Sequence, residues 1–193
     1  MTPRAEIVHW LFATGFLLLG LILLAEAIVG PEVWRMRRWR RYLWPAIAFT
    51  VGVSLWAVVV LYTNDTLHMV AHASWAQTAM LAGGTQLALA RGKLQSRWWT
   101  LAVSAAMAVS GIAFLVHEQN GWLFSRGAFL HHSLGWLLLF TAFFPVGQAI
   151  QPRRFAWNAG FAMTWIVVAV LLYSDRDVAP IFGHLSPLAG TPR

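Results

Sequence analysis

Cysteine is missing from the 193-residue chain, and charged residues make up only 11% of it. Without a thiol, the chain cannot form a disulfide, supply a thiolate metal ligand, hold an iron–sulfur cluster or attach a c-type haem covalently. Acidic residues number seven against 14 Lys and Arg, which gives a formal net charge of +7. The basic residues lie in short stretches between apolar segments, so membrane topology accounts for them and no nucleic-acid partner is expected.

Motifs of the common catalytic sites are also missing. The sequence has no phosphate-binding loop, no dinucleotide fingerprint and no recognisable nucleophile triad. Catalysis is therefore not assigned, and a non-enzymatic role is favoured.

Hydrophobic residues account for 59% of the chain and gather in stretches long enough to cross a membrane as helices. Lipid requires backbone groups to bond within each segment, and the alternating polarity of a barrel is missing. The sequence predicts an all-α, polytopic membrane bundle of about six helices in a single domain, residues 1–177. An irregular outer tail, residues 178–193, is expected to follow. The predicted spans are 6–29, 44–63, 66–90, 98–119, 128–150 and 157–175.

The distribution of Lys and Arg predicts the orientation of these spans. Ten of the 14 fall in the loops after the first, third and fifth spans, and four fall on the opposite side. The positive-inside rule then places both termini outside. We expect a multi-pass protein of a bacterial-type inner membrane, with the lipid bilayer as its first partner.

The seven histidines all fall on the predicted outer side. His68 and His72 are four residues apart, so they share one face of a helix. His117 ends the fourth span, while His131 and His132 begin the fifth span across a short turn. Adjacent residues diverge by about 100° around a helix, so only one of these last two is expected to face the core.

This arrangement predicts a transition-metal site near the outer face, because imidazole is a common ligand of copper, zinc and iron, and polar groups at membrane depth usually mark function. Glu118, Asp65 and Met69 are candidates for a supporting role around the metal. His9 and His184 are interpreted as peripheral. The predicted metal ligands are His68, His72, His117, His131 and His132.

The run His68-Met69-Val70-Ala71-His72, continuing through an apolar helix to a basic exit at Arg91, resembles the H-M-x-x-H helix of CtaG-like cytochrome oxidase assembly proteins. The resemblance covers about 25 residues, and the proline-containing run expected after the histidine pair is missing here. It implies copper as the metal, His68 and His72 as ligands, and an extracytoplasmic copper carrier or a respiratory oxidase as partner.

Three other functions remain open from the sequence. A b-type haem, in a membrane cytochrome or quinone-linked subunit, would need axial ligands on separate helices, such as His72 with His117 or His131. A second alternative is that the chain is a structural subunit of a membrane complex. A di-iron oxygenase is a minor alternative, because its histidine boxes need about eight ligands.

Overall fold

The computed structural model describes residues 2–63, 66–117 and 126–182, and within these ranges the chain is helical without a β-strand. The all-α prediction is confirmed. Short 3-10 turns at Arg40–Tyr42 and Arg97–Trp99 precede two of the long helices. The α-helices are α1 (Ala5–Val29), α2 (Pro31–Arg35), α3 (Leu43–Tyr62), α4 (Thr66–Ala90), α5 (Thr100–His117), α6 (Arg126–Thr141), α7 (Phe143–Ile150) and α8 (Phe155–Tyr173).

Five helical segments of the described chain are long and apolar enough to cross a membrane, as in a multi-pass membrane protein: Ala5–Val29, Arg40–Tyr62, Arg97–His117, Gly127–Ile150 and Phe155–Tyr173. The remaining predicted span, 66–90, is α4, a helix of 25 residues that carries more polar side chains. Large apolar side chains cover the outside of the bundle; Leu11, Val60 and Trp136 are 65–69% exposed. This outward apolar surface suits contact with lipid.

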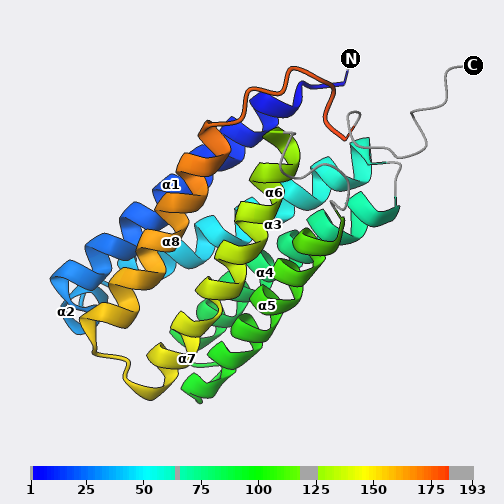
Figure 1. Ribbon diagram of the computed structural model, residues 1–193. Helices are drawn as coiled ribbons and strands as arrows, with labels where there is room; N and C mark the ends of the chain where they lie inside the picture. The colour runs from blue at the N-terminus through cyan, green and yellow to red at the C-terminus, as the bar shows by residue number, and fades with distance from the viewer. Residues whose placement is uncertain (1, 64–65, 118–125, 183–193) are drawn as a thin grey trace, which may run out of the picture.

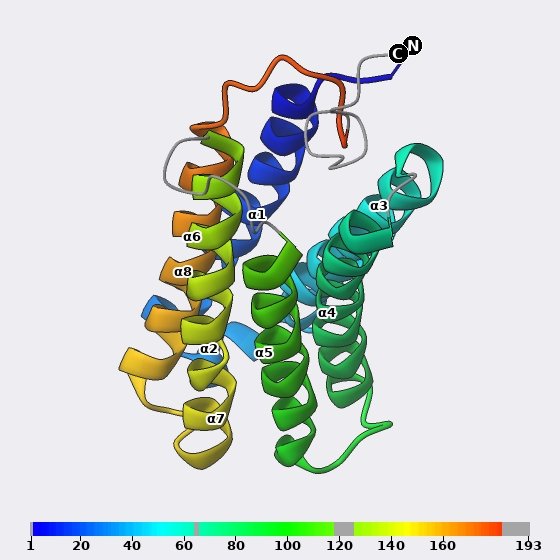
Figure 2. The ribbon, with the colours of Figure 1, turned by 45° about the vertical axis from the view of Figure 1, so that its right-hand side comes forward.

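The long helices form a closed ring. α1 packs against α3, α3 against α4, α4 against α5 and α5 against α6, while α8 packs against α6, α7 and α1 and so closes it (Figures 1 and 2). Because neighbours along the chain run antiparallel, the ring has two distinct ends. The histidine end holds His68, His72, His117 and His131. The arginine end holds α2 and the loops at residues 36–42, 91–96 and 151–154.

Glycine lets adjacent helices of the ring approach closely. A Cβ on Gly83 of α4 would lie 2.5 Å from the Pro45 carbonyl oxygen and 2.6 Å from the Phe49 nitrogen of α3. Between α5 and α6, a Cβ on Gly111 would lie 2.8 Å from the carbonyl oxygen of Gly135. Small residues at such crossings are typical of membrane helix pairs.

The fifth predicted span, 128–150, is interrupted. α6 ends at Thr141 and α7 begins at Phe143. The cause is Pro145, which lacks the N–H that would bond to the Thr141 carbonyl four residues earlier. The hydroxyl of Ser104 on α5 donates to the carbonyl of Ala142, so the neighbouring helix bonds to the backbone at the break.

The centre of the ring is filled by a stack of three aromatic rings. Phe16 of α1 lies between Trp75 of α4 and Trp165 of α8, with ring centroids 5.2 Å and 5.3 Å apart and interplanar angles of 6° and 12°. All three side chains are buried. This aromatic stack separates the histidine end from the arginine end.

The segment after α8 returns to the start of α1. The backbone N–H groups of Ala5 and Glu6 donate to the carbonyls of Ala179 and Asp177, and that of Ile181 donates to Pro3. Ile181 and Phe182 are then buried against the histidine end, at 6% and 5% exposure. Residues 178–182 are therefore non-helical and pack on the bundle.

Candidate functional site

Three helices bring histidines together at one end of the ring. His72 comes from α4, His117 from the last turn of α5 and His131 from the first turns of α6. Their ring centroids are 5.6 Å apart for His72 and His117, 5.6 Å for His72 and His131, and 4.9 Å for His117 and His131. We call these three residues the imidazole cluster.

His68 borders this cluster one helical turn before His72. Its ring centroid lies 5.4 Å from that of His117 and 6.2 Å from that of His72. His68, His72 and His131 are 3–6% exposed, although the site lies near the end of the bundle. The i, i+4 spacing on α4 therefore gives the shared face that the sequence predicts, and four of the five predicted ligands are adjacent.

Two phenylalanines enclose the cluster. Phe114, one turn before His117 on α5, lies 5.2–5.6 Å from the rings of His72, His117 and His131. Phe182 lies 4.9 Å from the ring of His72 on another side. Its φ of 60° is in the left-handed region, which is unusual for a bulky residue. The packed segment after α8 therefore holds Phe182 over the cluster.

Backbone carbonyls fix which nitrogen the cluster presents. The Nδ1 of His72 lies 2.9 Å from the His68 carbonyl oxygen, and the Nδ1 of His117 lies 3.0 Å from the Phe114 carbonyl oxygen. A carbonyl oxygen only accepts, so each Nδ1 carries a proton and donates it. In the neutral rings Nε2 then bears the lone pair, which is the arrangement that metal-binding histidines use.

His9 joins this end of the bundle from α1, although the sequence suggests a peripheral role. Its ring centroid is 6.2 Å from that of His131. Its Nδ1 donates to the Oδ2 of Asp175 over 2.5 Å, and the Asp175 side chain is only 2% exposed. A carboxylate behind a histidine orients the ring and raises the basicity of its other nitrogen.

Asp175 is held in its charged form. Burial alone would raise the pKa of its carboxyl, but the hydrogen bond and charge of His9, together with the N–H groups of Asp177 and Arg176, hold this pKa below its usual value. The N–H of Asp177 donates to Oδ1 over 3.1 Å, so both carboxylate oxygens have donors. His9 therefore faces a fixed negative charge.

A small cavity of about 20 Å³ lies between His9, His72, His131 and the two phenylalanines. A space of about 10–15 Å³ on the same measure admits one water molecule. A cofactor of haem size needs a pocket of roughly 300–1,000 Å³. The space among these histidines is thus of the size of one ion or one water molecule.

The remaining predicted residues lie elsewhere. His131 faces the core, while the adjacent His132 is half-buried and lies a further 100° or so around α6. Met69 is 44% exposed on the outer side of α4, so it does not line the imidazole cluster. Glu118, Asp65 and His184 lie outside the described residues.

His9 is the residue that the sequence analysis left out. Only its position on the predicted outer side pointed to it, since Asp175 is 166 residues away along the chain. In the described ranges, no group of three or more His, Asp or Glu side chains is already arranged to hold a metal ion. No family model matches the chain, and neither a curated protein nor a solved structure matches it.

Proposed function

We propose that the histidine end of this bundle binds a transition-metal ion through His72, His117 and His131. The observation that carries this proposal is the spacing of their rings. A metal–nitrogen bond of about 2.0–2.1 Å places an ion roughly 3 Å from each ring centroid, so three rings on one ion are roughly 5–5.5 Å apart. The observed separations of 4.9–5.6 Å lie within about 0.1 Å of this range.

Binding requires modest rotation of the rings toward a common point. The centroids are already close, and the tautomers of His72 and His117 present Nε2. The χ2 torsion of histidine is broad, so the rings turn at low cost. His68 and His9 flank the cluster on α4 and α1, where each extends the set of nitrogen donors.

Copper is the proposed metal. All the donors are imidazole nitrogens, and the chain has no cysteine. Among divalent ions of the first row, Cu²⁺ binds such sites most tightly. The resemblance of the His68–His72 segment to CtaG-like proteins supports the same metal. The protein would take up a copper ion at this site and pass it on, in copper handover or oxidase assembly.

The place of the site in the bundle supports a handover role. The cluster lies at the histidine end, which the distribution of arginines predicts to be on the outer side of the membrane. An extracytoplasmic copper carrier or a respiratory oxidase would therefore reach it without crossing the bilayer. Phe182 covers the cluster from the non-helical segment after α8.

Elemental analysis of the purified protein after incubation with Cu²⁺ and Zn²⁺ tests this proposal. We expect about one copper per chain, lost in His72→Ala and in His131→Ala. His132→Ala serves as the matched control and keeps the metal, because the ring contacts of the cluster run through His131. Size-exclusion profiles of the variants establish that each remains folded.

An absorption spectrum of the same samples separates the alternatives. A copper d–d band that disappears with His72→Ala supports the proposed ligands. A Soret band after expression with ample haem would instead point to a cytochrome, and copper retained by the double variant His72→Ala/His131→Ala would refute the site.

A further inference from the structure

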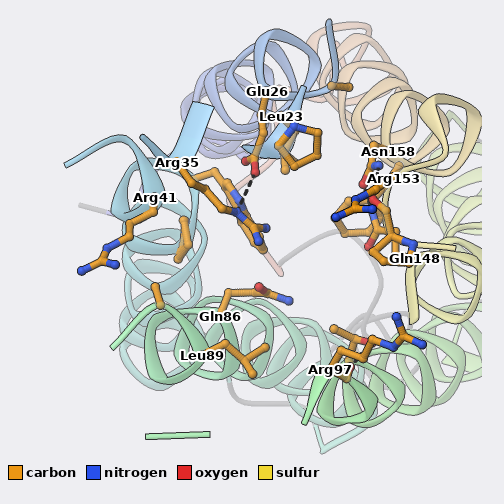
Figure 3. A pocket seen from close by; sticks show the side chains of 18 of the residues that line it. Leu23, Glu26, Arg35, Arg41, Gln86, Leu89, Arg97, Gln148, Arg153 and Asn158 are labelled. Carbon is orange, nitrogen blue, oxygen red and sulfur yellow. Dashed lines mark hydrogen bonds and ion pairs between the residues drawn. The ribbon is translucent and has the colours of Figure 1, made fainter. Parts of the chain in front are cut away.

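A large cavity lies at the arginine end, on the far side of the aromatic stack from the histidines. Its volume is about 920 Å³, which is within the range of sites for small molecules and cofactors. Helices of the ring surround it, and α1, α2, α4, α7 and α8 all contribute to its wall (Figure 3). We call it the arginine-end cavity.

The wall of this cavity is rich in groups that donate hydrogen bonds to anions. Arg35 of α2 and Arg153 of the loop before α8 reach into the cavity from opposite sides, and the Gln86 side chain of α4 also points into it (Figure 3). A guanidinium presents a planar pair of N–H donors that matches the geometry of a phosphate group. These three side chains therefore outline a place for an oxyanion.

The wall of the cavity also carries a net positive charge. Its ionisable lining residues include five arginines and two glutamates, an excess of three positive charges. Arg35 pairs with Glu26 over 3.4 Å, and Arg153 pairs with Glu32 over 2.6 Å. The excess is carried by Arg41, Arg97 and Arg154. A metal ion travelling from the histidine end would be repelled here, whereas an anion would be attracted.

The loop that carries Arg153 is fixed in place. The side-chain amide of Asn158 on α8 donates to the carbonyls of Pro152 and Arg154 over 2.9 Å and 3.2 Å. Gln148 of α7 in turn donates to the Asn158 side chain over 3.2 Å. Asn158 and Gln148 therefore position the loop on either side of Arg153.

Glu26 gives the cavity a second unusual feature. It lies within α1 and is 7% exposed, although an acid inside a membrane helix is costly and usually marks a functional site. Its partner Arg35 lines the same cavity and has a side chain that is 60% exposed. An incoming anion would compete with Glu26 for that guanidinium.

We propose that the arginine-end cavity binds the phosphate group of an anionic ligand, with Arg35 and Arg153 holding the phosphate oxygens. Two sources share this chemistry, the headgroup of an anionic phospholipid and a free phosphorylated solute. Basic pockets between membrane helices on the cytoplasmic side commonly receive such headgroups. Trp39, Trp98 and Trp99 are 51–57% exposed at the same end, as in side chains at headgroup depth.

Titration of the full chain in an uncharged detergent tests this inference. The probes are inorganic phosphate, a short-chain phosphatidylglycerol and a phosphatidylcholine of the same chain length. We expect binding of phosphate, phosphatidylglycerol or both, weakened about tenfold or more in Arg153→Gln and further in Arg35→Gln/Arg153→Gln. Glu26→Gln should bind more tightly, because it removes the competing carboxylate.

Arg38→Gln is the matched control, since Arg38 is exposed in the loop after α2 and does not line the cavity. We expect its affinity to stay within about twofold of the wild type. Arg153 has an 82% exposed side chain, so its substitution leaves the fold intact. Phosphatidylglycerol binding alone identifies a lipid headgroup as the ligand, and phosphate binding without lipid binding identifies a free solute.

The inference fails if neither anionic probe binds the wild type, or if Arg35→Gln/Arg153→Gln binds as tightly as the wild type. Copper content is measured on the same variants and should not change. Loss of copper binding in the histidine variants and loss of phosphate binding in the arginine variants are thus separate results.

Discussion

The contact between His9 and Asp175 joins the first helix to the end of the last one. The Asp175 carboxylate accepts from His9 and from the N–H of Asp177, and the indole N–H of Trp10 donates to the Asp175 carbonyl over 3.2 Å. Hydrogen bonds to a charged group contribute about 1.5–3 kcal/mol. This one residue therefore fixes both the His9 ring and the segment that carries Phe182 over the cluster.

Asp175→Asn should make the stability of the protein less dependent on acid pH. Because the folded pKa of Asp175 is depressed, its contribution is present above the unfolded value of about 3.9 and is lost as pH falls through the folded pKa. The wild type should therefore be more stable than the variant at about pH 5. This difference should shrink below about pH 4 in thermal unfolding of the detergent-solubilised protein.

Glu32→Gln is the control for this pH series, because its carboxylate is 71% exposed at the opposite end of the bundle. Its stability difference from the wild type should stay small throughout. A wild-type advantage over Asp175→Asn that persists undiminished at pH 3 would contradict the assignment.

Local spacing was sufficient to predict some residues of the site and not others. His68 and His72 share a face because the helix repeat requires it, and His117 joins them at the same depth. The choice between His131 and His132 depends on how α6 is rotated against α5, which tertiary packing decides. The position of the His9 ring could not be predicted from local spacing, because its carboxylate partner Asp175 lies 166 residues away along the chain.

The pair of helices α3 and α4 shows how a single atom sets an interhelical distance. Gly83 lies against the backbone of Pro45 and Phe49, whereas a Cβ on the adjacent Gly84 would meet only the Phe49 ring at 4.0 Å. These neighbours have equal helix propensity and differ in their surroundings. They therefore form a matched pair for measuring the effect of close packing.

Gly83→Ala should destabilise the bundle, because the new methyl group meets backbone atoms that cannot turn aside. Overpacking of this kind costs about 1–3 kcal/mol. Gly84→Ala should lie between no change and about 1 kcal/mol more stable, since alanine favours the helix. Reversible unfolding in mixed detergent measures both values, and equal losses in the two variants would contradict this account of the contact.

At the scale of elements, hydrophobic length was a good guide to the helices and a poor one to their interruptions. The six predicted segments correspond closely to the long helices, because lipid leaves the backbone few alternatives. The break at Ala142 follows from Pro145, a local signal that an unbroken apolar run conceals. The packing of residues 179–181 on the start of α1 depends on long-range backbone pairing, which has no signature in apolar length.

The whole molecule is a ring whose two ends differ in chemistry. Imidazoles and one buried carboxylate gather at the histidine end, and guanidinium groups and amides line the arginine-end cavity. The ring closes through contacts of α1 with α8, from opposite ends of the sequence. Neither the closure nor the arginine-end cavity follows from the pattern along the chain, since both depend on which helix faces are paired.

The orientation of this ring is testable with topology reporters. We expect a phosphatase that is active only outside the cytoplasm to show activity when fused at residue 63 or at the N-terminus. Fusion at residue 38, within the five-arginine stretch, should be inactive, because that loop is expected to stay inside. The reverse pattern of activities would overturn the predicted direction of all the spans.

The aromatic stack also provides an intrinsic fluorescence probe of the imidazole cluster. Trp75 contacts Phe114 at a centroid distance of 5.2 Å, and Phe114 touches all three imidazoles of the cluster. A paramagnetic ion held there would quench the emission of this buried indole more strongly than that of Trp165, on the far side of Phe16. Binding of such an ion at the histidine end would therefore lower the tryptophan fluorescence from the centre of the bundle.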